Sequence, residues 1–71
     1  MIVYQRLRDL REDFDKNQAQ IAEILGMQQT QYSRYERGER ELPMRHFITL
    51  AKYYGVSLDY LAGLIDTPRK L

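Results

Sequence analysis

The sequence contains no cysteine and no tryptophan, and its one histidine is His46. Without cysteine, neither a disulfide framework nor a zinc finger can form, and a single histidine leaves little material for a transition-metal site. No apolar run approaches the ~20 residues of a membrane span, and the first ten residues lack the long apolar core of a signal peptide. These absences predict a cytoplasmic protein with no membrane association, no metal and no cofactor.

The residue types that enzymes use are not arranged for catalysis in this sequence. Ser33 and Ser57 have no neighbouring His and Asp arrangement, and Ser57 is better explained as a helix cap. Neither a phosphate-binding loop nor a dinucleotide fingerprint occurs. We therefore expect a protein that is not an enzyme.

The net charge of +1 is too small to indicate a protein that simply coats nucleic acid.

Helix-ending and helix-capping residues recur along the chain, and no strand pattern does. Asn17 and Ser57 suit N-caps, whereas Gly26, Gly38 and Gly55 suit the turns that end helices. The pattern predicts an all-α fold of five helices, in one domain over residues 1–65 with a C-terminal tail over 66–71. The expected helices cover residues 2–13, 18–25, 28–37, 43–54 and 58–63.

The third expected helix has an unusual exposed surface. At 100° per residue, Tyr32 and Tyr35 share one face, while Thr30, Ser33, Arg34 and Arg37 occupy the opposite face. Gln28 and Gln29 stand at its N-terminal end. A helix that needs only solubility usually takes Glu and Lys, which are better helix formers than Thr and Ser. Two short helices joined by a glycine turn, the second exposing such a surface, predict a helix-turn-helix.

The amides and hydroxyls on this surface suit the reading of DNA bases. In the major groove Gln pairs bidentately with adenine, Arg with guanine, and Ser or Thr with either. The alternative is an ordinary polar face chosen for solubility. The N-terminus of the second helix, capped by Asn17, offers N–H groups and a partial positive charge to a phosphate. The candidate base-reading residues are Gln28, Gln29, Thr30, Ser33 and Arg34.

Three sequence elements resemble a known family. They are "QAQIAEILG", "SRYERG" and "VSLDYL", and their order and spacing are similar to those of the XRE group of helix-turn-helix regulators, which includes the Cro and repressor proteins of lambdoid phages. The resemblance extends from about Tyr4 to Pro68. It implies a five-helix bundle of the lambda-repressor-like DNA-binding type, with the second and third helices forming the helix-turn-helix. It also implies a small transcriptional regulator that binds double-stranded DNA.

The same resemblance implies roles for individual residues. Gln18 matches a glutamine that binds a DNA phosphate and braces the recognition helix, and Gln29 matches one that reads a base. Arg11 and Glu36 match a buried ion pair between the first and third helices. Glu39 and Glu41 depart from the family pattern, where basic residues often help to grip the DNA backbone. The residues expected to contact phosphates are Asn17, Gln18, Arg37 and Arg40.

The C-terminal helix predicts a protein contact as well. It carries more apolar residues than a core of this size obviously needs, and such a surplus usually marks an interface. We expect a homodimer on a palindromic operator. The open alternative is an interaction module, such as a small antitoxin whose main partner is another protein. The candidate contact residues are Leu58, Tyr60, Leu61, Leu64 and Ile65.

Overall fold

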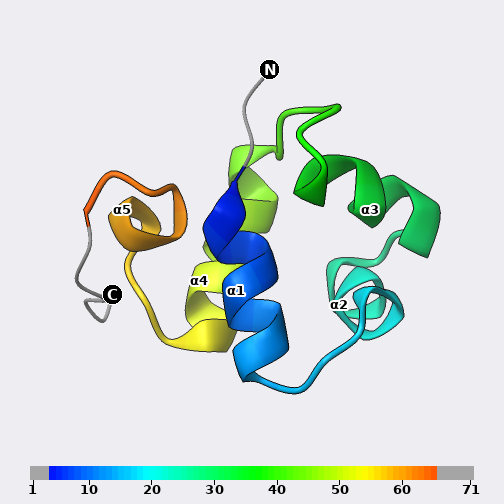
Figure 1. The fold of residues 1–71 in the computed structure, drawn as a ribbon, viewed down its shortest axis with the longest axis horizontal. Helices are drawn as coiled ribbons and strands as arrows, with labels where there is room; N and C mark the ends of the chain where they lie inside the picture. Colours follow the sequence, from blue (N-terminus) through cyan, green and yellow to red (C-terminus); the bar gives the residue numbers. More distant parts are fainter. Residues whose placement is uncertain (1–3, 66–71) are drawn as a thin grey trace.

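Five helices follow one another along the chain in the computed structural model, which describes residues 4–65 (Figure 1). No strand occurs within these residues, so the all-α prediction is confirmed. The predicted tail, residues 66–71, lies outside the described part, as does the predicted start of the first helix at Ile2. The helices are α1 (Gln5–Asp13), α2 (Gln18–Leu25), α3 (Gln29–Glu36), α4 (Met44–Tyr54) and α5 (Leu58–Leu61).

The start of α2 shows how local sequence determines a helix boundary. The Asn17 side chain accepts a hydrogen bond from the Gln20 N–H at 2.8 Å, and the Gln20 side chain accepts one from the Asn17 N–H at 2.9 Å. This reciprocal pair is a capping box, which satisfies two N–H groups that the helix itself cannot use. Gly26 ends the helix with a φ of 71°, a conformation that disfavours residues with a Cβ atom.

The other predicted boundaries differ from the structure by only a few residues. Gln28 and Arg37, expected inside the third helix, are its N-cap and C-cap. Pro43, expected in the first turn of the fourth helix, precedes α4 as its N-cap with an extended ψ of 148°. The fifth helix ends at Leu61, and its N-terminus is capped by the Ser57 hydroxyl, which accepts from the Tyr60 N–H at 3.1 Å.

The core lies where the apolar stripes of α1 and α4 meet the inward faces of the other helices. In Figure 1, α1 and α4 occupy the middle of the molecule, α2 and α3 lie at one end of its longest axis, and α5 lies at the other. The predicted α4 stripe is buried in full: Phe47, Leu50, Ala51 and Tyr54. The other buried apolar residues are Leu7, Leu10, Ile21, Ala22, Tyr32, Tyr35, Leu42, Val56 and Leu61.

One predicted contact residue is wrong. Leu61 is 0% exposed and belongs to the core cluster, so it has no surface to offer to another protein. Its position on the inward side of α5 is the physical reason, because α5 packs against α1 and α4. Leu64, three residues later, is 75% exposed. The remaining candidates, Leu58, Tyr60 and Ile65, are partly exposed.

Candidate nucleic-acid interface

A short turn joins α2 to α3 and holds the two helices in contact. The turn begins at Gly26, whose backbone has the left-handed conformation and whose N–H donates to the Glu23 carbonyl at 3.1 Å. The Met27 N–H then donates to the Ala22 carbonyl at 2.9 Å, and Met27 packs against the core. The turn thereby fixes the direction in which α3 begins, and the predicted helix-turn-helix is present.

The outer side of α3 exposes the side chains that the sequence selects as base readers. Tyr32 and Tyr35 bury the inner side, at 0% and 5% exposure. Gln29, Thr30 and Arg34 are exposed and Ser33 is half-buried. A shallow groove runs over this surface and continues onto α2. Its lining residues are Gln18, Gln29, Thr30, Ser33, Arg34 and Arg37.

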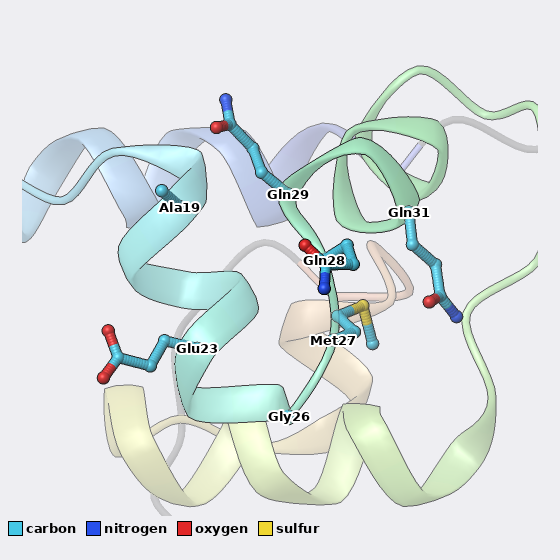
Figure 2. Close-up of a pocket in the computed structure, with 7 residues that line it drawn as sticks. All are labelled: Ala19, Glu23, Gly26, Met27, Gln28, Gln29 and Gln31. Carbon is cyan, nitrogen blue, oxygen red and sulfur yellow. The ribbon is translucent and has the colours of Figure 1, made fainter.

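Gln28 and Gln29, at the start of α3, line different parts of the surface. Figure 2 shows Gln29 projecting on the same side as Ala19 in the first turn of α2, whereas Gln31 points the opposite way. Gln28 lies beside Met27, next to an open hollow at the α2–α3 turn. Gln28 also lines a second hollow, together with Thr30, Arg34 and Arg40. Gln29 alone of the two reaches the groove that Gln18 and Ser33 line.

A buried polar cluster fixes α3 against α1 and α2. Arg11 forms a bidentate pair with Glu36, with Nε–Oε2 at 2.7 Å and Nη2–Oε1 at 3.2 Å. Their side chains are only 12% and 4% exposed. Gln18 Nε2 donates to Glu36 Oε1 at 3.1 Å, and Arg11 Nη1 donates to the Lys16 carbonyl at 2.9 Å. Gln18 of the groove is thus attached to the buried ion pair.

Arg11 and Glu36 each stabilise the charged form of the other. Burial alone raises the pKa of the Glu36 carboxyl, but hydrogen bonds from its neighbours, led by Arg11, outweigh burial and lower that pKa below its ordinary value. The hydrogen bond to Glu36 likewise raises the pKa of Arg11. Burial and the nearby Glu36 charge raise the pKa of Tyr32. Glu36 is therefore ionised at neutral pH inside the fold.

The N-terminal end of α2 also faces this groove through Gln18. The capping box occupies the N–H groups of Asn17 and Gln20 and the Asn17 side-chain oxygen. In the described residues, no hydrogen bond uses the backbone N–H groups of Gln18 and Ala19, the first two of the helix. Donors of this kind at a helix N-terminus suit an anion.

The four arginines between residues 34 and 45 have different surroundings. Arg34 and Arg40 are exposed, and neither forms an ion pair in the described part of the chain. Arg37 is engaged: its Nε donates to Glu39 Oε2 at 2.6 Å and its Nη1 donates to the Ser33 hydroxyl oxygen at 2.8 Å. Arg45 lies exposed in the first turn of α4.

Sequence reasoning missed the pairing of Arg37 with Glu39. Residues two apart on a helix do not face each other, so their spacing gave no signal. The signal was Gly38, because a helix that ends in a left-handed glycine turns the next residue back along the helix. Residues 4–65 contain no group of His, Asp and Glu side chains that could hold a metal ion, and no helix long and apolar enough to cross a membrane.

Comparison with known proteins places these features in a family context. A family model described as helix-turn-helix matches residues 7–61. The uncharacterized HTH-type transcriptional regulator YobD of Bacillus subtilis is 39% identical over 64 residues, which are 90% of this chain and 57% of that protein. The cryptic phage CTXphi transcriptional repressor RstR of Vibrio cholerae is 35% identical over 63 residues, which are 89% of this chain and 56% of that protein.

A solved structure gives the same result at the level of the fold. The crystal structure of a transcriptional regulator from Listeria innocua superposes with a TM-score of 0.78 at 26% sequence identity, covering 96% of this chain and 61% of that chain. The chain thus spans a little more than half the length of the curated relatives that it matches.

Proposed function

This chain belongs to the helix-turn-helix family of the XRE type, and on that premise we propose that it binds double-stranded DNA in a sequence-specific manner, with α3 in the major groove. The family is one of DNA-binding regulators, and the proposal concerns how this chain makes its contacts. The observation that supports it most is the single exposed groove in which Gln29, Thr30, Ser33 and Arg34 of α3 lie together with Gln18 of α2.

The base-reading part of the proposal rests on side-chain chemistry and position. In helix-turn-helix proteins the N-terminal residues of the second helix contact base edges while the first helix crosses the backbone. We assign base reading to the amides of Gln28 and Gln29, the hydroxyls of Thr30 and Ser33, and the Arg34 guanidinium. Each good bidentate contact discriminates between bases by ~1–3 kcal/mol. Gln29 is the first choice, since it projects beside the start of α2.

The phosphate-binding part rests on the start of α2 and on two arginines. Gln18 has one amide hydrogen on Glu36 and keeps a second one for a phosphate. The N–H groups of Gln18 and Ala19 add donors at the positive end of the helix, and Asn17 stabilises that end as the cap. Arg37 and Arg40 supply positive charge beside the C-terminal end of α3. Phosphate contacts of this kind position a protein on DNA without reading sequence.

We further propose that the protein acts as a transcriptional repressor in the cytoplasm. Two relatives support this role by their names, one a transcriptional regulator and one a phage repressor. The relatives are longer than this chain, so their full activity is extended to it only as part of this proposal. None of the comparisons favours the alternative interaction module.

A homodimer on a palindromic operator completes the proposal. One α3 offers few base contacts, whereas a genome offers about 10⁶ or more competing sites, so two copies are needed for useful discrimination. Leu64 is the most exposed large apolar side chain, and Leu58, Tyr60 and Ile65 are partly exposed near it in sequence. They lie on or just after α5, at the end of the molecule away from α3, which leaves the reading surface clear (Figure 1).

Selection of bound sequences from a random duplex library tests this function. We expect enrichment of a palindrome whose half-sites are centred about one helical turn apart, ~10 base pairs. A single unrepeated half-site would contradict the dimer and leave DNA reading in place. Selection that enriches no sequence would overturn the proposed function.

A further inference from the structure

Glu39, two residues after the C-cap of α3, is an acidic residue to which the proposed function gives no role. Glu39 lies in the loop that joins α3 to α4. Its carboxylate lies 2.6 Å from Arg37 Nε, and both side chains are about half exposed. An acidic residue in this place opposes the phosphates that Arg37 is proposed to bind.

The backbone holds Glu39 in this position. The Gly38 N–H donates to the Tyr35 carbonyl at 3.2 Å, and the Glu39 N–H donates to the Arg34 carbonyl at 2.9 Å. Together with the φ of 77° at Gly38, these two bonds form a Schellman motif, which fixes the residue after the glycine relative to the last turn of the helix. The carboxylate therefore reaches Arg37 because the helix terminus directs it there.

The pair also fixes Arg37 from its other side. Arg37 Nη1 donates to Ser33 Oγ at 2.8 Å, so the guanidinium is held between Glu39 and the reading surface of α3. Two of its five N–H groups are used, and the others remain for an incoming acceptor. The hydrogen bond from Arg37, and the more distant Arg34 charge, lower the pKa of Glu39, so its carboxylate is ionised at neutral pH.

We propose that Glu39 is a built-in counter-ion for Arg37, which occupies the guanidinium before DNA does and thereby limits the sequence-independent grip of the protein on the DNA backbone. The inference rests on the proposed DNA-binding function. A cation already neutralised by a carboxylate releases fewer condensed counter-ions when it meets a phosphate. Glu39 then sets the strength of binding and its dependence on salt, whereas the residues of the reading surface set the sequence.

The test compares wild-type protein with Glu39→Gln, using the selected duplex and a scrambled duplex at several salt concentrations. Glutamine keeps the size of the side chain and removes its charge. We expect Glu39→Gln to tighten binding to both duplexes by the same factor and to steepen the fall of log K with log[salt] by ~0.9 per protomer, or ~1.8 for the proposed dimer. The gain in affinity of the dimer should accordingly be about 12-fold larger at 50 mM than at 200 mM salt.

Two controls separate this pairing from a general effect of charge. Glu41→Gln removes the same charge from the same loop, and Glu41 forms no ion pair or hydrogen bond in the described residues. Its gain should be clearly smaller than that of Glu39→Gln. In an Arg37→Gln background, Glu39→Gln should lose most of its effect, because the cation that it releases is no longer present.

Three results would overturn the inference. Equal gains from Glu39→Gln and Glu41→Gln would mean that only the net charge of the loop matters. An undiminished gain in the Arg37→Gln background would mean that Arg37 is not the cation involved. Weaker binding by Glu39→Gln would mean that the carboxylate helps Arg37 to bind DNA. Failure of the proposed function looks different, since wild-type protein would then bind the two duplexes equally or bind neither of them.

Discussion

Removing Arg11 tests whether the buried ion pair holds the DNA-binding unit together. Arg11→Met keeps a long, flexible side chain but leaves Glu36, whose side chain is 4% exposed, without its bidentate partner. Breaking a buried pair in this way costs about 3–5 kcal/mol. A 71-residue domain has a total stability of only about 4–11 kcal/mol at ~0.05–0.15 kcal/mol per residue. The variant should therefore lose a large part of its stability.

The measurement is thermal unfolding followed by circular dichroism. For a domain of this size 1 kcal/mol shifts Tm by about 4–8 °C, so Arg11→Met should lower Tm by more than ~12 °C. Arg8→Met is the matched control, since Arg8 lies on the same helix and its pair with Glu12, at 3.7 Å, is largely exposed. The control should melt close to wild type. If both variants melt within a degree or two of wild type, the pair does not stabilise the fold as argued.

Three further predictions concern stability and assembly. The pKa of Glu36 is lowered in the folded state, so the stability that its charged form contributes is present above pH ~4.5 and should fall as the pH drops below that value. The free energy of unfolding of Arg11→Met, measured by chemical denaturation, should therefore depend less on acid pH than that of wild type. The Tyr54 hydroxyl is buried and has no hydrogen-bond partner among residues 4–65, so Tyr54→Phe should leave the free energy of unfolding unchanged or raise it. A loss above ~1 kcal/mol would reveal a partner. Leu61→Ala should lower the free energy of unfolding by ~2–5 kcal/mol, because Leu61 is in the core. Leu64→Ala should cost little stability and should instead weaken dimerisation, measured by analytical ultracentrifugation. The reverse pattern would refute the assignment of Leu61 to the core.

Local sequence signals predicted most of the fold. Asn17 and Gly26 delimit α2 at the residues expected, because a cap and a left-handed turn are decided by the residues that form them. The α4 stripe was equally predictable, since eleven helical residues give a clear angular period. The inward direction of Leu61 was not, because α5 has only four residues and too few turns to define a face.

Helical spacing predicted the elements but not the contacts between them, and the Arg11–Glu36 pair was expected only from the family resemblance. The exposed surface of α3 follows from its helical period, and the tyrosines on its other side are buried as expected. The bond from Gln18 to Glu36 links α2 to α3, and the pair of Arg37 with Glu39 depends on the turn at Gly38. Neither contact could be predicted from helical spacing, because the first depends on tertiary packing and the second on a left-handed backbone turn.

Binding of Gln29→Ala to the selected duplex and to a scrambled duplex, at several salt concentrations, tests the central claim most directly. Gln31→Ala is the matched control, because Gln31 is an exposed glutamine of the same helix that points the other way (Figure 2). We predict that Gln29→Ala loses ~1–3 kcal/mol per half-site on the selected duplex and much less on the scrambled one, with an unchanged salt slope, since glutamine carries no charge. Gln31→Ala should bind both duplexes like wild type. Equal weakening of both duplexes by Gln29→Ala would contradict the claim that this face of α3 reads DNA sequence.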